Sequence, residues 1–278
     1  MTLFCPNGTH YQVFSPLRTD QKHPSENPYD TLVFIHGVGL DLTIWRNQVA
    51  NLQAKYQIIT YDLLGHGLSP KAPSDLELRG LTHQLNALLE YLKLKKVHLI
   101  GFSLGGLVAR IFAIQFHHKL QSLTLMNSVF NRSDALRAII LKRVTEVEKH
   151  GPSANLEQAL TRWFSNLYTQ THSDYIDQLR AQVLANNKTS YSRCYRLFGE
   201  GDNAMHEQLS LITCPTLVTT GELDPGSTPA MSYALAEKIS SATAIILPDA
   251  RHMMPVEHAC EVSALLHKFV VANSQIGL

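Results

Sequence analysis

Six short runs of apolar and β-branched residues recur along the chain, each bounded by polar or glycine-containing segments. Runs of this length and composition are typical of strands that are buried on both faces of a parallel sheet. They occupy residues 31–35, 57–61, 97–100, 122–126, 216–220 and 242–247. Between them, residues 81–92 and 104–116 have apolar positions at helical spacing. This alternation predicts an α/β fold, a doubly wound and mostly parallel sheet with helices on both faces.

One long segment interrupts the alternation. Residues 129–206 contain no strand pattern, but apolar positions recur at helical spacing within 135–150, 156–168 and 175–186, and 187–190 has the composition of a turn before a further helix. The segment is too long for a single crossover between two strands. The sequence therefore predicts an all-helical cap at 129–206, inserted into a core made of residues 1–128 and 207–278.

Composition and charge exclude several classes of protein. The 278 residues are 45% hydrophobic and 17% charged, which is typical of a globular chain with an ample core. Lys and Arg total 24 against 23 Asp and Glu, a formal net charge of +1. That balance gives no general electrostatic footprint for nucleic acid or an anionic membrane. The four cysteines are scattered without C-x-x-C spacing, so we expect free thiols and neither a disulfide scaffold nor a zinc site.

The N-terminal residues lack the basic and long apolar regions of a signal peptide. The apolar stretch 97–116 is interrupted by Arg110 and by glycines, so no membrane span is expected. We expect a soluble cytoplasmic protein, and the sequence leaves its oligomeric state open.

The motif Gly101-Phe102-Ser103-Leu104-Gly105 is the first sign of chemistry. It lies between a predicted strand and a predicted helix, which is the context that gives G-x-S-x-G its meaning. A serine at the tip of such a tight turn projects its hydroxyl away from the sheet. The turn forces unusual backbone angles and close contacts, so we expect glycine to be required at 101 and 105.

With this motif in its context, the chain resembles the α/β-hydrolase fold family over nearly its whole length outside the cap. The loop His36-Gly37-Val38-Gly39 follows the first clear strand, as the oxyanion loop does in that family. The resemblance implies that the backbone N–H groups of Val38 and Leu104 form an oxyanion hole. His36 is expected to be structural, and the turn that begins at Asp62 is expected to be architectural.

The same resemblance implies an acid and a base in the order serine, acid, histidine. Asp224 falls at the acid position after the strand at 216–220, with Glu222 as the alternative, and His252 falls at the base position after the last strand. Ser103 is then the nucleophile, His252 the general base and acid, and Asp224 the residue that orients His252. The spacing of the other histidines suggests no metal site, and we expect no metal or organic cofactor.

Alternatives to acyl transfer by Ser103 remain open at this stage. The serine argues against members of the family that use an aspartate or a cysteine nucleophile. Ser103 can attack a carbonyl to form an acyl-enzyme, or it can orient a water molecule on which the base acts directly. A non-catalytic receptor of the same fold is also compatible with an intact Ser103, Asp224 and His252.

The cap segment is rich in arginine for a chain of net charge +1. It contains Arg132, Arg137, Arg143, Arg162, Arg180, Arg193 and Arg196. Because guanidinium forks suit carboxylates, two inward-facing arginines would select a small anionic substrate, a dicarboxylate. We single out Arg143 and Arg162 as substrate-binding residues. Trp163 and Tyr191 are candidate pocket residues, and Tyr195 and Phe198 are further ones that can equally serve cap packing.

Two stretches narrow the resemblance within the family. Residues 221–231 and 251–257 are similar to the branch that acts on ring-cleavage products. One subgroup is the 3-oxoadipate enol-lactonase type, which opens a lactone that bears a carboxylate. The other is the (acylaminomethylene)succinate hydrolase type, which cleaves an enamide dicarboxylate at its C–N bond in bacterial breakdown of N-heterocycles. The second resembles this chain better through Arg143, Arg162 and residues 195–202, so we expect that activity first, the lactonase or a carboxylester hydrolase second.

Overall fold

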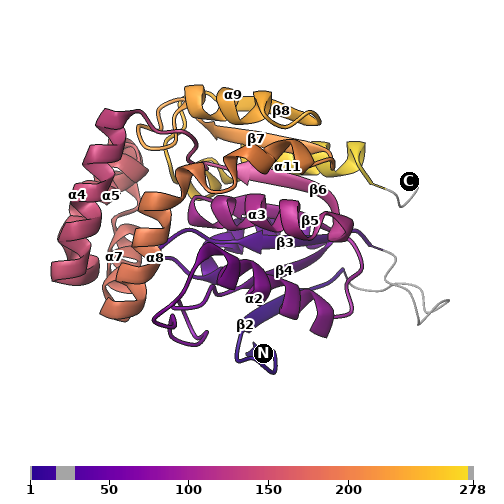
Figure 1. The fold of residues 1–278 in the computed structure, drawn as a ribbon, viewed down its shortest axis with the longest axis horizontal. Helices are drawn as coiled ribbons and strands as arrows, with labels where there is room; N and C mark the ends of the chain where they lie inside the picture. The colour runs from indigo at the N-terminus through magenta and orange to yellow at the C-terminus, as the bar shows by residue number, and fades with distance from the viewer. Residues whose placement is uncertain (1, 17–28, 275–278) are drawn as a thin grey trace.

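The computed structural model describes residues 2–16 and 29–274. Its centre is an eight-stranded sheet in the order β1-β2-β4-β3-β5-β6-β7-β8 (Figure 1). The six strands from β3 onward run parallel to one another, and β1 and β2 join the β4 side in antiparallel pairing. The strands are β1 Leu3–Phe4, β2 His10–Phe14, β3 Thr31–Ile35, β4 Gln57–Tyr61, β5 Val97–Phe102, β6 Leu120–Met126, β7 Thr216–Gly221 and β8 Ala242–Leu247.

The predicted doubly wound, mostly parallel sheet is confirmed, and all six predicted strands are present. The two additional strands, β1 and β2, are a short antiparallel pair at the edge. Their residues do not form a continuous apolar run, because β2 is only partly buried along its second half. Residues 15–30 are polar and contain prolines, a composition that predicts a loop or hairpin, and most of this segment lies outside the described residues.

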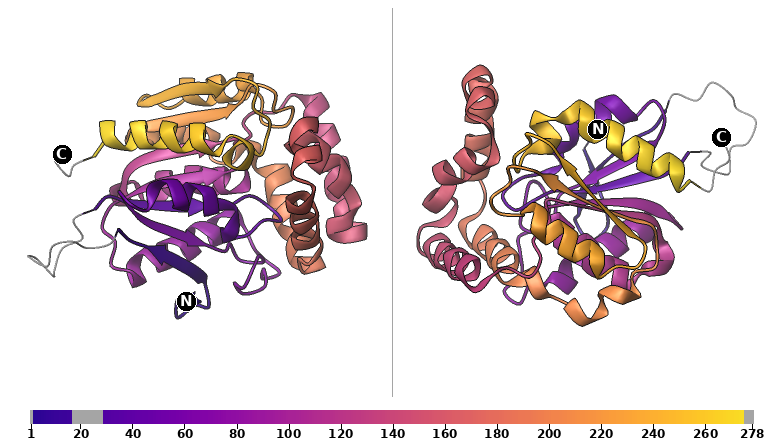
Figure 2. Two further views of the ribbon diagram at one scale, coloured as in Figure 1. Left: turned by 180° about the vertical axis from the view of Figure 1, so that it is seen from behind. Right: turned by 90° about the horizontal axis from the view of Figure 1, so that it is seen from above.

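Helices cover both faces of the sheet. On the side that faces the viewer in Figure 1 lie α2 (Leu78–Tyr91) and α3 (Leu104–Gln115), while α11 (Ala259–Ala272) lies on the opposite side, as the view from behind in Figure 2 shows. The remaining elements outside the cap helices are α1 Arg46–Leu52, α9 Pro229–Glu237, α10 Met254–Glu257 and the 3₁₀ turns η1 Leu42–Trp45 and η2 His117–Lys119.

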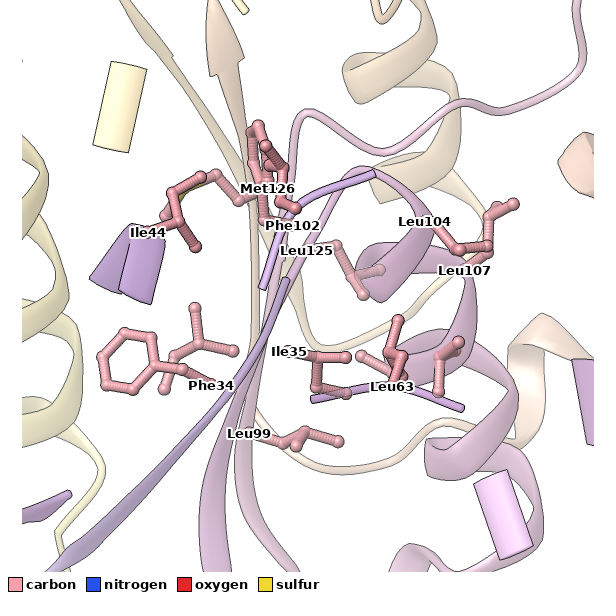
Figure 3. Close-up of a cluster of buried hydrophobic side chains, with 14 of the residues drawn as sticks. Phe34, Ile35, Ile44, Leu63, Leu99, Phe102, Leu104, Leu107, Leu125 and Met126 are labelled. Atoms are coloured by element: carbon pink, nitrogen blue, oxygen red, sulfur yellow. The ribbon is translucent and has the colours of Figure 1, made fainter. Parts of the chain in front are cut away.

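The core is built from the central strands and the helices that cover them. Figure 3 shows the adjacent residues Phe34 and Ile35 of β3 pointing to opposite sides of the sheet, where each meets other apolar side chains. Both are fully buried, as is Leu99 on β5. A strand that is covered on both faces has no polar face, which explains the continuous apolar runs in the sequence.

Between β6 and β7 the chain forms helices that gather at one end of the sheet (Figures 1 and 2). We call these five α-helices the cap helices: α4 Asp134–His150, α5 Leu156–Trp163, α6 Asn166–Thr171, α7 Ser173–Leu184 and α8 Lys188–Glu200. Short 3₁₀ turns accompany them at η3 Gly151–Asn155, η4 Gly201–Asn203 and η5 His206–Leu211. The end of the sheet that they cover is the end where the parallel strands terminate at their carboxyl ends.

Two boundaries in this segment differ from the sequence prediction. The helix predicted over 156–168 ends at Trp163, because Phe164 is extended and the hydroxyl of Ser165 accepts a hydrogen bond from the Tyr168 N–H to begin α6. The turn predicted at 187–190 is the start of α8 instead, since Asn187 caps that helix by accepting from the Ser190 N–H. Both are capping effects, in which one side-chain oxygen satisfies a free backbone amide.

Among the described residues, no helix is both long enough and apolar enough to cross a lipid bilayer.

Candidate active site

Ser103 sits at the sharp turn between β5 and α3. Its backbone has φ of 56° and ψ of −115°, a conformation that costs energy in any residue with a Cβ. The Ser103 N–H donates to the Met126 carbonyl oxygen at 2.9 Å, which fastens the turn to the end of β6. The serine is held in a strained geometry at the tip of a strand–turn–helix unit, as the G-x-S-x-G motif predicts.

The glycines of the motif are required by close backbone contacts. A Cβ at Gly101 would lie 2.2 Å from the Gly105 carbonyl oxygen, and a Cβ at Gly105 would lie 2.4 Å from the Ile35 carbonyl oxygen. Neither contact can be relieved by a side-chain rotation, since the obstructing atoms belong to the backbone. The turn therefore tolerates no side chain at either position, which is the expectation from sequence.

Asp224 and His252 form a buried pair on loops after β7 and β8. His252 Nδ1 lies 2.7 Å from Asp224 Oδ2, and the same carboxylate oxygen accepts from Asn127 Nδ2 at 2.8 Å. Asp224 Oδ1 accepts from the N–H groups of Gly226 and Ser227. Burial raises the pKa of the Asp224 carboxyl, but the charge of His252 and these hydrogen bonds outweigh burial and leave the pKa below its usual value. The carboxylate is thus kept ionised beside the imidazole.

Glu222, the alternative acid, points elsewhere. Its side chain is exposed, and Glu222 Oε2 accepts from the Asp249 N–H at 3.1 Å. Of the two carboxylates considered, only Asp224 contacts His252.

The loop after β3 approaches the serine closely. A Cβ at Gly37 would lie 3.1 Å from the Ser103 Cβ, so the following residue, Val38, lies beside the turn that carries Ser103. Within the described part of the chain, neither the Val38 N–H nor the Leu104 N–H has a hydrogen-bond acceptor. Leu104 is also the first residue of α3, whose N-terminus favours negative charge.

Two buried histidines hold this loop in place. His36 Nδ1 lies 2.8 Å from the Gly37 carbonyl oxygen, and His36 Nε2 accepts from the Leu63 N–H at 3.0 Å. His66 Nε2 accepts from the Gly39 N–H at 2.9 Å. Burial, together with the neighbouring His36, lowers the pKa of His66 to about 3. His66 is therefore neutral near neutral pH, which an imidazole must be to accept a hydrogen bond at Nε2.

The serine, the Asp224–His252 pair and the cap helices enclose one pocket of about 180 Å³. Pockets for drug-sized ligands are roughly 300–1,000 Å³, so this pocket suits a smaller molecule. The sequence-predicted residues that line it are Val38, Ser103, Arg143, Arg162, Trp163, Tyr191, Tyr195, Phe198, Asp224 and His252. Leu104, whose predicted contribution is a backbone N–H, lies next to Ser103 at the start of α3.

Arg143 on α4 and Arg162 on α5 bring two positive charges to the pocket, where the charge of Asp224 also acts on Arg162. Both are half-buried, and neither has a hydrogen-bond or ion-pair partner within residues 2–16 and 29–274. Burial lowers the pKa of Arg162, and the like charge of Arg143 lowers it further, so the two guanidinium groups are close enough to repel. Two neighbouring cations without a counter-ion are a favourable site for an anion.

Each of the other cap arginines has a partner in the described chain. Arg132 and Arg137 share the fully buried carboxylate of Asp202, while Arg180 pairs with Glu157 and Asp177, and Arg196 pairs with Glu148. Arg193 has no acidic partner, but its Nη1 donates to the Ala72 carbonyl oxygen. Arg132 also lines the pocket. It is ion-paired with Asp202, a carboxylate that it shares with Arg137.

Aromatic rings line the rest of the cap side. Trp163 stacks on the His252 ring with centroids 6.3 Å apart, and Tyr191 is buried beside Tyr195. Burial raises the pKa of Tyr195 despite the opposing charges of Arg143, Arg162 and Arg132, so the Tyr195 hydroxyl stays protonated as a donor. Leu136, Ile139 and Ile140 of α4 add an apolar wall.

Asn127 and Asp202 are the two residues of this region that sequence reasoning missed. Asn127 follows β6 with a φ of 48°, and the signal available was its position at the carboxyl end of a central parallel strand. Asp202 gave no signal, because its importance lies in a pairing with Arg132 and Arg137 that is distant in sequence. Within the described residues, no group of His, Cys, Asp and Glu is arranged to hold a metal ion.

Comparison with known proteins places these features in a family. A family model described as alpha/beta hydrolase fold matches residues 30–259. The chain is 32% identical over 227 residues to an (E)-2-((N-methylformamido)methylene)succinate hydrolase of Acinetobacter baylyi, covering 81% of this chain and 84% of that protein. It is 29% identical over 228 residues to 3-oxoadipate enol-lactonase 2 of the same organism, covering 81% and 83%.

A solved structure agrees with both sequence relatives. The enol-lactonase from Burkholderia xenovorans LB400 superposes with a TM-score of 0.84 at 25% identity, covering 98% of this chain and 100% of that chain. The family resemblance inferred from the motif at residues 101–105 and from residues 221–231 and 251–257 is confirmed. The chain belongs to the α/β-hydrolase fold family and is a hydrolase of that fold.

Proposed function

We propose that the protein is a serine-dependent hydrolase of a small anionic ring-cleavage product, with an (E)-2-(acylaminomethylene)succinate-type enamide dicarboxylate as its substrate. The observation that carries the proposal is the pair of unpartnered guanidinium groups, Arg143 and Arg162, in the pocket that also contains Ser103 and His252. The 32% identical succinate hydrolase supports the same substrate class.

In the proposed reaction Ser103 is the nucleophile. His252, oriented by Asp224, takes the hydroxyl proton as Ser103 Oγ attacks the acyl carbonyl carbon. The tetrahedral intermediate collapses by breaking the C–N bond, and His252 returns the proton to the leaving nitrogen. The acyl group is then an ester of Ser103.

Water completes the cycle by the reverse sequence of proton movements. His252 removes a proton from the water molecule as its oxygen attacks the acyl-enzyme carbonyl, and then protonates Ser103 Oγ as the carboxylic acid leaves. In both halves the Val38 and Leu104 N–H groups bind the negatively charged oxygen. Their lack of acceptors within the described chain supports this role, since preorganised free donors cost no reorganisation in the transition state.

The substrate carboxylates are proposed to bind Arg143 and Arg162, with Trp163 and Tyr191 as pocket walls. These four residues come from the segment 129–206, which we propose as a cap over a core of residues 1–128 and 207–278. Hydrogen bonds between charged groups are among the strongest in proteins, so an anion in a partly buried site gains both affinity and orientation. A pocket of about 180 Å³ leaves room for a dicarboxylate but not for a long acyl chain.

The second candidate is hydrolysis of a carboxylate-bearing lactone or ester. It is favoured by the 29% identical enol-lactonase and by the structural match to another enol-lactonase. The same triad would serve, because only the leaving atom changes from nitrogen to oxygen. One carboxylate would then use the arginine pair.

A turnover panel tests the proposal. An (acylaminomethylene)succinate, a 3-oxoadipate-type enol lactone and p-nitrophenyl acetate are each assayed with wild type, Arg143→Ala and Arg162→Ala. Arg196→Ala is the matched control, because Arg196 is also a cap arginine but is exposed and already paired with Glu148.

We expect the enamide to be the preferred substrate, with kcat/KM reduced about 10- to 100-fold in each pocket variant, as for loss of a hydrogen bond to a charged group. The neutral ester should change little in either variant, and Arg196→Ala should change nothing. Preference for the lactone would retain the triad and replace the substrate. A neutral ester that outperforms both anionic substrates would refute the arginine pair as the specificity element.

A further inference from the structure

The imidazole of His252 lies between two aromatic rings that come from different parts of the fold. Phe102, the residue before the nucleophile, has its ring centroid 5.0 Å from that of His252. Trp163, the last residue of α5, is stacked on His252 with centroids 6.3 Å apart and planes at 26°. Both separations lie within the 4.5–7 Å range of favourable ring pairs.

Three contacts fasten the end of α5 to the segment that carries His252. The Met253 N–H donates to the Trp163 carbonyl oxygen at 2.9 Å, and the Ser165 N–H donates to Glu257 Oε2 at 3.1 Å. Arg251 Nη1 donates to the Thr161 carbonyl oxygen at 3.5 Å. Residues on both sides of Trp163 are thus joined to residues on both sides of His252.

The break between α5 and α6 allows the hydrogen bond between the Met253 N–H and the Trp163 carbonyl oxygen. Because Phe164 is extended, α5 ends at Trp163, and the Trp163 carbonyl oxygen points to Met253 instead of accepting an intrahelical bond. The end of α5 thus places Trp163 next to His252. A single helix through 156–168 would have used that carbonyl internally.

From these contacts we infer that Trp163 is a positioning residue for the base, holding the His252 imidazole in place. This inference rests on the proposed role of His252. Trp163 is therefore more than a wall of the substrate pocket.

Other charged or titratable groups also lie around His252. Asp224 contacts the ring directly, Arg162 lies on the same helix as Trp163, and Arg251 precedes His252 in its own loop. From the remaining cap helices, Arg143 on α4 and Tyr195 on α8 line the same pocket. Leucine or phenylalanine at position 163 leaves all of these groups unchanged.

Fluorescence gives a test that needs no substrate. The chain has two tryptophans, so Trp45→Phe leaves Trp163 as the sole indole emitter. A protonated imidazole in contact with an indole quenches its emission. We expect Trp163 emission to fall as His252 becomes protonated on lowering the pH, and the transition to vanish when His252→Gln is added. Emission that does not depend on pH, or a transition that persists without His252, would overturn the inference.

Kinetics separates positioning from substrate contact. Assayed with both the enamide and p-nitrophenyl acetate, Trp163→Leu should lower kcat about tenfold for both substrates and leave KM for the enamide nearly unchanged, since a misplaced base slows the reaction without weakening substrate binding. Trp163→Phe, which keeps a ring, should retain most of kcat. A rise in KM for the enamide alone, with kcat unchanged, would assign Trp163 to the substrate instead.

The failure of this inference and of the proposed substrate can be told apart. The fluorescence titration and the neutral ester report on His252 whether or not the enamide is turned over. If Trp163→Leu does not fold, the titration in the Trp45→Phe protein decides the matter by itself.

Discussion

The strand ends and the cap helices contribute opposite electrostatic conditions to one pocket. At the strand ends, the buried carboxylate of Asp224 is satisfied from four directions, by His252, Asn127, Gly226 and Ser227. In the cap, Arg143 and Arg162 face each other's charge with no partner in the described chain. One region is electrostatically complete without a ligand, and the other is incomplete.

The difference indicates how the two regions divide the work. A catalytic unit gains from preorganised hydrogen bonds, because its groups then need no rearrangement during the reaction. A recognition unit gains from unsatisfied charge, since the substrate itself supplies the missing partner. Variants that affect only one region should therefore separate turnover from substrate choice.

The largest effect is expected at the strand ends. Ser103→Ala removes the proposed nucleophile and should lower kcat at least about 10³-fold for every substrate, anionic or neutral. Circular dichroism and thermal unfolding should match wild type, because the hydroxyl is not part of the turn's backbone bonding. Turnover at a wild-type rate would refute the role of Ser103.

Asp202→Asn should give the largest loss of stability in the cap. The Asp202 carboxylate is fully buried against Arg132 and Arg137, and removal of its charge leaves buried guanidinium groups without a counter-ion. We expect urea unfolding to show a loss of about 3 kcal/mol. The control is Glu148→Gln, which breaks the exposed pair with Arg196 and should cost less than about 1 kcal/mol. Equal costs for the two variants would contradict the special status of Asp202.

Lowering the pH should destabilise the fold through His66 before it protonates Asp224. The pKa of His66 is about 3 in the folded protein against an ordinary 6.5, so between these pH values the unfolded chain binds more protons. The free energy of unfolding therefore falls as pH drops from 6.5 toward 3, with a slope from His66 of up to about 1.4 kcal/mol per pH unit. Urea unfolding at several pH values measures the slope, and His66→Gln should reduce it. An unchanged slope in that variant would assign the pH dependence to other groups.

A smaller effect is expected from Asn127→Ala. It removes one hydrogen bond to the Asp224 carboxylate, which is worth about 1.5 kcal/mol and corresponds to roughly tenfold in kcat/KM. The loss should be the same for the enamide and for the neutral ester, because the bond acts through Asp224 and His252. A loss confined to anionic substrates would place Asn127 in recognition rather than in orientation of the acid.

Sequence patterns predicted the sheet well and selected residues that the fold brings together around one pocket, for a physical reason. Strands buried on both faces need continuous apolar runs, and a nucleophile turn needs glycines where backbones touch, so both leave local signals. The end of α5 at Trp163 left a weaker signal in the sequence, since the only indication is Ser165, a common helix N-cap residue in an otherwise helical pattern. Asp202 left none, because its partners are about 65 to 70 residues away.

Arg143 and Arg162 illustrate an intermediate case. Composition identified an arginine-rich segment, and the aromatic residues that follow Arg162 led to the choice of two of its seven arginines. Only the folded chain distinguishes the arginines that have acidic partners from those that lack them, because pairing depends on which helices pack together. The pattern of charge in a sequence gives the number of cations but not their neighbours.

The fully buried Arg110 of α3 gives the boundary between cap and core an unusual property. Its guanidinium donates to the carbonyl oxygens of Val129, Gly201, Asp202 and Ala204, on both sides of the inserted segment. Carbonyl oxygens are present whatever the side chains are. The contacts of Arg110 therefore depend on the path of the backbone and not on the side chains at these positions. Asp202 and its partners Arg132 and Arg137 all lie within residues 129–206. If residues 129–206 are exchanged as a cassette between relatives, this attachment can stay intact while the proposed substrate-binding residues are replaced.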